Sequence, residues 1–235
     1  MNMNITGRTT FALVSLVAIA LLAGCSPGEV KKACRSEAHL IDMTGSTAGF
    51  RGAWPTELTQ SARDTLVRGD RFFASTFTSG AGTVDWSVTA DGCDSPETRP
   101  RKHERWAGAQ AAVLGPKLTG LTHARAHGGS DPLGALEATE KLPRLSVVRI
   151  WSDLVIQDDG VDLSRPAPEA EIQRLADAWV PRLRGLKGVT VIALHPGRGV
   201  DSDVAVRQSE GLLRTVLHRA GATLEWEPVL AGGAR

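Results

Sequence analysis

Short apolar stretches alternate along this chain with segments whose apolar residues recur at the period of an α-helix. The patterns that predict buried strands occupy residues 38–43, 71–77, 147–156, 189–194 and 223–229, and 82–89 alternates as a half-buried edge strand does. Helical periodicity occurs at 56–67, 103–118, 131–142, 168–183 and 203–219, and Pro116 is expected to end or kink the second of these helices. This alternation predicts an α/β fold with a doubly wound, mostly parallel open sheet flanked by helices.

The first 24 residues predict a signal peptide rather than part of the fold. Arg8 precedes a nearly unbroken apolar run from Phe11 to Leu22, which is too short for a typical membrane span. The following Leu-Ala-Gly-Cys resembles the bacterial lipobox, and the resemblance implies that Cys25 is lipidated and becomes the mature N-terminus. The protein is then exported and anchored to the cell membrane or the outer membrane by its acyl chains. An ordinary cleaved signal and an uncleaved anchor helix are the alternatives.

After the signal peptide, the sequence predicts a polar tether over residues 25–36, one α/β domain over 37–230 and a C-terminal tail over 231–235. Removal of residues 1–24 takes away Arg8 and no acid, which leaves 26 basic and 26 acidic side chains. A chain balanced in this way has no overall electrostatic attraction for nucleic acid, so nucleic acid is not an expected partner.

Two cysteines remain once Cys25 is assigned to lipid. An exported protein meets oxidising conditions, and these conditions favour a disulfide between Cys34 and Cys93. The bridge would tie the segment before the first strand to the region around residue 90. Two unpaired buried thiols are the alternative, because the sequence does not establish that the two Cα atoms come close enough.

Three short polar segments follow predicted strands or open a predicted helix. They are Asp-Met-Thr-Gly-Ser at 42–46, Gly-Ser-Asp at 129–131 and Ser-Asp at 152–153. A doubly wound sheet gathers such segments at the carboxyl ends of its strands, where ligands of this architecture bind. Carboxylates and hydroxyls without histidine or thiol suit a hard divalent cation, with Mg²⁺ as the first choice and Mn²⁺ or Ca²⁺ as alternatives.

These segments, in this order and on these elements, resemble the metal-ion-dependent adhesion site of the von Willebrand factor A domain family. The resemblance extends over roughly residues 37–230. It implies a cation held by oxygen ligands from Asp42, Thr44, Ser46, Ser130 and Asp153, with Asp131 supporting these ligands without touching the metal. It also implies a binding module rather than an enzyme, in which a protein partner supplies an acidic residue to the cation.

Three positions depart from the family pattern. Thr44 and Ser130 exchange serine and threonine relative to the family, and both exchanges keep the hydroxyl. Leu154 stands where many members carry glycine after the aspartate, which is expected to alter the loop without removing the ligand.

Other interpretations of the same residues stay open. Asp42 and its neighbouring hydroxyls are also suited to capping a helix, and Ser130 to capping the helix predicted from Asp131. A hydrolase on a similar sheet would use Asp42, Ser130 and His195. A third reading is a structural component of the cell envelope that binds no metal.

Overall fold

The computed structural model describes residues 34–79, 84–125, 128–158, 161–195 and 204–228. The predicted signal peptide, Cys25, most of the tether and the predicted tail lie outside these ranges. Residues from Cys34 onward form one unit that holds both hydrophobic core clusters and the complete sheet described below. A protein that lacks the first 25 residues therefore retains the whole core.

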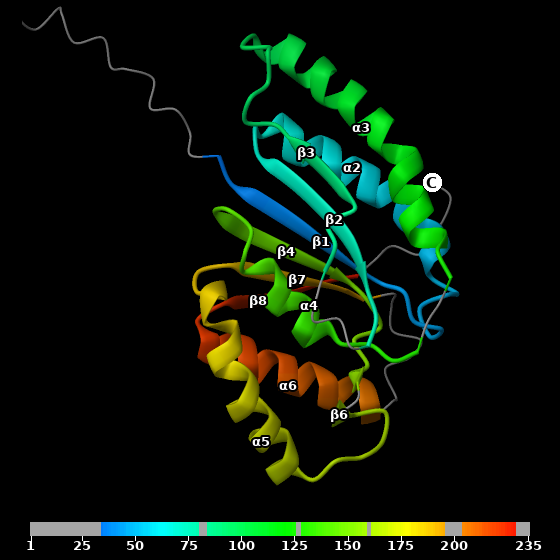
Figure 1. The fold of residues 1–235 in the computed structure, drawn as a ribbon, viewed down its shortest axis with the longest axis vertical. Helices are drawn as coiled ribbons and strands as arrows, with labels where there is room; N and C mark the ends of the chain where they lie inside the picture. The colour runs from blue at the N-terminus through cyan, green and yellow to red at the C-terminus, as the bar shows by residue number, and fades with distance from the viewer. Residues whose placement is uncertain (1–33, 80–83, 126–127, 159–160, 196–203, 229–235) are drawn as a thin grey trace, which may run out of the picture. The chain divides into compact units, whose positions relative to one another are not determined.

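A six-stranded sheet forms the centre of this unit, in the order β3-β2-β1-β4-β7-β8 (Figure 1). Its strands are β1 (Ser36–Asp42), β2 (Arg71–Phe77), β3 (Val88–Asp91), β4 (Leu145–Trp151), β7 (Thr190–His195) and β8 (Thr223–Pro228). Neighbouring strands are parallel except β2 and β3, which run antiparallel. A separate two-stranded ladder joins β5 (Gln157–Asp158) to β6 (Val161–Asp162). The predicted fold class, a mostly parallel α/β sheet, is confirmed.

Helices cover both faces of the sheet (Figure 1). They are the short 3₁₀ helix η1 (Arg51–Ala53), α2 (Trp54–Val67), α3 (Pro100–His123), α4 (Pro132–Thr139), α5 (Glu169–Trp179), the 3₁₀ segment η2 (Val180–Leu186) and α6 (Val204–Ala220). One core cluster joins the sheet to α2 and α3, and the other joins it to α4, α5 and α6. Adjacent residues of β1 serve opposite clusters, Leu40 the second and Ile41 the first, because side chains alternate along a strand. Among the described helices, none combines the length and apolar character of a membrane span.

Helix α3 runs through Pro116 and ends at His123, so of the two predicted effects of Pro116, a kink or an end of the helix, the end is wrong. Proline removes one backbone hydrogen bond from a helix interior, which costs about 3 kcal/mol. The pyrrolidine ring lies on the exposed side of α3, whereas Leu114 and Leu118 are buried against the core on the other side. Burial of this apolar face outweighs the lost hydrogen bond, and the helix continues.

Two strand boundaries also differ from the predicted ones. The edge strand expected at 82–89 lies at Val88–Asp91, and Trp86 instead packs edge-on against Phe73, with ring centroids 5.8 Å apart. Strand β4 stops at Trp151 rather than at residue 156. The apolar residues after Trp151 are buried in a loop, and periodicity alone does not distinguish them from a strand.

Cys34 and Cys93 are joined by a disulfide, as the sequence predicts, with their Cα atoms 5.6 Å apart. The bridge closes a span of 59 residues and ties the start of β1 to the loop after β3. Replacing both cysteines by serine is expected to lower the free energy of unfolding by about 2–4 kcal/mol, because the unfolded chain regains the entropy of the opened loop. Urea denaturation measures the change, and an unshifted midpoint would contradict the prediction.

Candidate functional site

The predicted site lies where the strand order reverses. Strand β1 is flanked by β2 on one side and by β4 on the other, so the chain winds away from β1 in both directions. Ligands of doubly wound sheets bind at the carboxyl ends of the strands at such a point. Asp42 is the last residue of β1, and Ile41 pairs with Trp151, the last residue of β4. The two segments 42–46 and 152–153 therefore leave adjacent strands at the same edge.

Asp42 is the centre of a buried hydrogen-bond cluster drawn from three segments. Its side chain is fully buried, and its Oδ2 atom accepts hydrogen bonds from the hydroxyls of Ser130 (2.8 Å) and Ser152 (2.5 Å). The Oδ1 atom accepts the backbone N–H of Thr44 at 2.9 Å. Asp42 and Ser130, predicted to share a site although 88 residues apart, are in direct contact.

Ser152 also belongs to this cluster. The sequence predicts that Asp153, not Ser152, is the residue of segment 152–153 that takes part in the site. The Ser152 hydroxyl donates to Asp42 and accepts the backbone N–H of Leu154 at 2.8 Å. The Asp153 carboxylate, 4% exposed, instead accepts the backbone N–H of Val155 at 3.2 Å within its own loop. The register between β1 and β4 explains why Ser152 contacts Asp42. Ile41 pairs with Trp151, so the next residues along, Asp42 and Ser152, lie beside each other.

The segment after β1 forms a turn that holds two hydroxyls next to each other. Thr44 Oγ1 and Ser46 Oγ are 3.0 Å apart, and Ser46 is exposed to solvent. The Thr47 hydroxyl fixes the turn by donating to the carbonyl oxygens of Asp42 and Thr44, both at 3.0 Å. Adjacent ligands of an octahedral Mg²⁺ ion, with bonds of about 2.1 Å, lie about 3.0 Å apart. The spacing of these two hydroxyls therefore fits neighbouring positions of such a shell.

Burial raises the pKa of the Asp42 carboxyl above its usual value, although hydrogen bonds from Ser152, Thr44 and Ser130 oppose this effect. A buried carboxylate without a cationic partner is energetically unfavourable. Among the described contacts of Asp42, the donors are neutral hydroxyls and a backbone amide. A cation near this cluster would supply the missing positive charge.

Asp131 has a local structural role that the sequence analysis assigned in part to Ser130. Asp131 is the N-cap of α4, and its Oδ1 atom accepts the backbone N–H of Gly134 at 2.8 Å. The helix begins at Pro132, so the alternative reading of Ser130 as its N-cap is wrong. Gly134 is required here, because a Cβ atom at this position would collide with the Asp131 carboxylate.

Leu154 has a backbone φ of 63°, in the left-handed region that favours glycine. Glycine would adopt this backbone conformation more easily than leucine does. Leu154→Gly would relieve about 1–2 kcal/mol of backbone strain but would remove a fully buried side chain, which costs about 2–5 kcal/mol. We expect net destabilisation of about 1–3 kcal/mol, measured by urea unfolding. A variant that unfolds at higher urea would contradict this balance.

Two other groups of residues concern alternative sites. Cys34, Asp91 and Cys93 lie close enough together to hold a metal, but both sulfurs belong to the disulfide. His195, a residue of the hydrolase alternative, ends β7, and its side chain lies outside what the structure describes. The Ser130 hydroxyl donates its proton to Asp42 in this structure.

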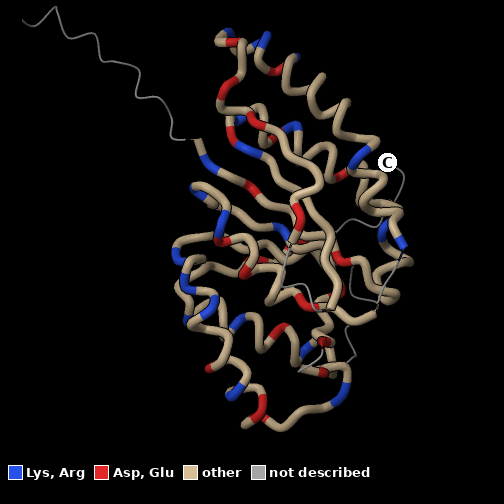
Figure 2. Tube along the Cα trace, viewed as in Figure 1, with Lys and Arg blue, Asp and Glu red and all other residues tan. Residues whose placement is uncertain are grey.

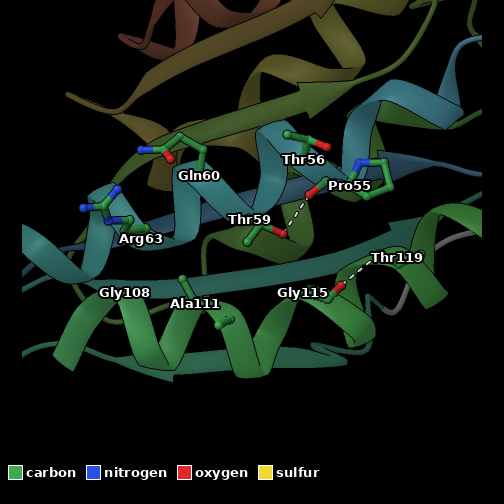
Figure 3. A pocket seen from close by; sticks show the side chains of 10 residues that line it. Pro55, Thr56, Thr59, Gln60, Arg63, Gly108, Ala111, Gly115 and Thr119 are labelled. Carbon is green, nitrogen blue, oxygen red and sulfur yellow. Dashed lines mark hydrogen bonds between the residues drawn. The ribbon is translucent and has the colours of Figure 1, made fainter. Parts of the chain in front are cut away.

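A surface pocket of about 430 Å³ lies between α2 and α3 (Figure 3). Small residues of α3, among them Gly108, Ala111 and Gly115, leave room for it beside α2. The Thr59 hydroxyl, which faces this pocket, already donates to the carbonyl of Pro55 at 2.7 Å. None of the residues that line this pocket belongs to the Asp42 cluster.

Comparison with known proteins leaves the family of this chain unassigned. No family model matches it, and no curated protein matches it. Among solved structures it is similar to the pilus adhesin SpaC of Lactobacillus rhamnosus GG in an open conformation, with a TM-score of 0.46 and 12% identity. The match covers 83% of this chain and 28% of that chain, so the chain spans little more than a quarter of the adhesin's length.

Proposed function

We propose that this chain is a lipid-anchored, extracytoplasmic binding module of the von Willebrand factor A type, which engages a protein partner through a divalent cation. The observation that carries the proposal is the double hydrogen bond to Asp42 Oδ2 from Ser130 and Ser152, hydroxyls of two separate loops. This arrangement assembles one carboxylate and several hydroxyls at the end of the sheet where ligands bind.

The donor atoms at this site suit a hard cation. The residues that would hold it are Asp42, Thr44, Ser46, Ser130 and Asp153. When bound, the cation would offer a positive centre that a carboxylate oxygen of the partner can join. The set contains oxygen atoms alone, which favours Mg²⁺ over softer metals, with Mn²⁺ and Ca²⁺ as further candidates. Ser152 would hold Asp42 in place, since its hydroxyl connects that carboxylate to the backbone of Leu154.

The proposed location outside the cytoplasm is supported by the disulfide between Cys34 and Cys93, because such bonds persist in oxidising compartments. The lipid anchor is proposed from the signal-like N-terminus and Cys25. Labelling of the full chain with radioactive palmitate tests it directly. Loss of label on Cys25→Ser would support the anchor, and label that persists on this variant, or is absent from the wild type, would contradict it.

Calorimetric titration of Mg²⁺ and Mn²⁺ into residues 26–235 tests the metal site. We expect saturable binding that is lost on Asp42→Asn and unchanged on Asp94→Asn, an exposed aspartate beside the disulfide. Ser130→Ala is expected to weaken binding by at least about 10- to 100-fold, because loss of a ligand costs no less than loss of a group that only orients the ligands. Equal heats in the wild type and the Asp42→Asn variant, with both proteins folded, would favour the metal-free structural component instead.

A further inference from the structure

The parallel strands of the sheet begin at the edge opposite the Asp42 cluster. The backbone places exposed basic residues there: the carbonyl of Arg35 accepts the N–H of Arg71 at 2.8 Å, and that of Arg144 accepts the N–H of Ser36 at 3.0 Å. Lys187 lies one residue before Gly188, whose N–H donates to the carbonyl of Gly221 just before β8. The beginning of α3 reaches the same edge, because His103 Nε2 lies 3.0 Å from the carbonyl oxygen of Leu66 near the end of α2.

We call this edge, where the parallel strands begin, the amino edge. Its exposed basic residues are Arg35, Arg99, Arg101, Lys102, Arg105, Lys141, Arg144, Arg184 and Lys187. Within the part of the chain that the structure describes, none of these nine forms an ion pair. The acidic residues nearest to the start of α3 are fewer: they are Asp94, Glu97 and Glu104. Glu104 is paired with Arg63 at 3.4 Å, and Asp91 with Arg71 at 2.9 Å. Basic segments accordingly gather where β1, β4 and β7 begin (Figure 2).

The opposite edge carries five acidic residues, of which Asp42, Asp131 and Asp153 are buried. Its acidic residues are Asp42, Asp131, Asp153, Asp158 and Asp162, at or beyond the carboxyl ends of β1 and β4. The amino edge also carries acidic side chains, among them Asp64, Glu104 and Glu140, but its exposed basic residues outnumber them. An excess of positive charge on one side gives the domain a preferred orientation in an electric field, with the amino edge towards negative charge.

The chain also enters the domain at the amino edge. Cys34 lies just before the first residues of β1 and nine positions after Cys25. Nine residue steps span at most about 30 Å when fully extended. A lipid on Cys25 would therefore keep the amino edge within about 30 Å of the bilayer.

We infer that the amino edge docks onto anionic lipid headgroups and so orients the domain, with the Asp42 cluster facing away from the membrane. The inference rests on the proposed lipid anchor and is independent of metal binding at Asp42. Basic side chains close to an anionic bilayer are attracted to its surface potential, and the attraction falls off within a Debye length of about 10 Å at 0.1 M salt. Docking leaves the candidate metal site accessible to a partner outside the membrane.

Vesicle sedimentation of residues 26–235 tests the inference without the lipid, in EDTA so that metal has no role. We expect the protein to bind vesicles of phosphatidylcholine mixed with phosphatidylglycerol and not vesicles of phosphatidylcholine alone. The variant Arg101→Glu, Arg144→Glu, Lys187→Glu is expected to lose at least about tenfold in partition coefficient. Added salt is expected to reduce binding of the wild type.

The matched control reverses three exposed basic residues away from the amino edge: Lys117→Glu, Arg125→Glu, Arg165→Glu. It has the same net charge as the first variant, so it is expected to retain most of the binding if the edge, rather than total charge, determines docking. Equal losses in the two folded variants, or no binding of the wild type to anionic vesicles, would overturn the inference. Palmitate labelling and the metal titration test the anchor and the cation site separately, so a failure here is distinguishable from theirs.

Discussion

Asp42→Asn is expected to abolish saturable Mg²⁺ binding and, at the same time, to raise the unfolding temperature of the metal-free protein at neutral pH. The carboxylate is fully buried, and burial raises its pKa because the charged form is poorly solvated there. Folding at neutral pH therefore includes the cost of burying this charge. An amide at the same position removes that cost together with the charge that a cation needs.

Asparagine is suited to the position because the hydroxyls can reverse their roles. Its side-chain oxygen can accept the N–H of Thr44, which now donates to Asp42 Oδ1. Its amide group has two hydrogens, and these can be donated to the oxygens of Ser130 and Ser152. The variant therefore keeps three hydrogen bonds without the buried charge, whereas Asp42→Ala would leave the same three donors without their acceptor.

Thermal unfolding followed by circular dichroism, in EDTA and then in excess Mg²⁺, measures both effects. In EDTA the Asp42→Asn variant should unfold at a higher temperature than the wild type, and Asp42→Ala at a lower one. Added Mg²⁺ should raise the unfolding temperature of the wild type alone, because a ligand that binds the folded state stabilises it. A wild type insensitive to Mg²⁺ would contradict the metal site, and an Asp42→Asn variant less stable than the wild type in EDTA would contradict the argument from buried charge.

The location of the site follows from sequence, but its contacts do not. The apolar strand before Asp42 and the alternation of strands with helices predict that Asp42 and Ser130 meet at one edge of a parallel sheet, and they do. Which residue of the Ser152–Asp153 pair faces Asp42 depends on the register between β1 and β4 and on the end of β4 at Trp151. A continuous apolar pattern predicts neither the register nor the end of the strand. The contact between Ser152 and Asp42 is therefore not predictable from the sequence.

Strand β1 holds a second feature that its apolar character conceals. Residues 38–43 predict an apolar strand, yet Glu37 and His39 are also buried, 3% and 0% exposed. The side chain of Arg149 in β4 and the hydroxyl of Thr65 in α2 both reach Glu37, at 2.9 Å and 3.0 Å. These partners lie 112 and 28 residues away, so local periodicity carries no signal for the network.

Glu37→Gln is expected to lower the free energy of unfolding by about 3–5 kcal/mol, the usual cost of removing one partner from a buried ion pair. Glu37 accepts hydrogen bonds from both Arg149 and Arg68, which form ion pairs with its two carboxylate oxygens. Burial by itself would raise the pKa of Glu37, but hydrogen bonds from His39 and Arg149 hold it well below its usual value. In the glutamine variant an amide N–H replaces one carboxylate oxygen and faces the guanidinium of Arg149 or Arg68, which can only donate hydrogen bonds.

Glu227→Gln is the matched control, because Glu227 pairs with the same Arg149, at 2.9 Å, but has a side chain that is 49% exposed. Exposed ion pairs contribute about 0–1 kcal/mol, so this variant should unfold within that range of the wild type in urea. Similar destabilisation by the two substitutions would show that burial of Glu37 does not set the cost.

The same network predicts that the protein loses stability as the pH falls from about 6.5. Trp151 Nε1 donates to His39 Nδ1 at 3.1 Å, and an indole N–H can only donate, so the neutral ring carries its proton on Nε2. That Nε2 atom lies 3.2 Å from Glu37 Oε1 and donates to it. Protonation of Nδ1 would oppose the Trp151 N–H, and burial, the main cause, already lowers the pKa of His39 from 6.5.

Below pH 6.5 the unfolded chain therefore binds a proton at His39 that the folded protein does not bind. The free energy of unfolding falls by up to about 1.4 kcal/mol for each pH unit. The lowered pKa of Glu37 causes a second loss of stability below about pH 4.5. As the pH falls, this carboxyl takes up a proton in the unfolded chain before it does so in the folded protein. Urea unfolding between pH 7.5 and 5 measures the slope. His39→Gln, which does not titrate, should be less stable at pH 7.5 but should show a flatter profile, and an unchanged slope would assign the acid sensitivity to other groups.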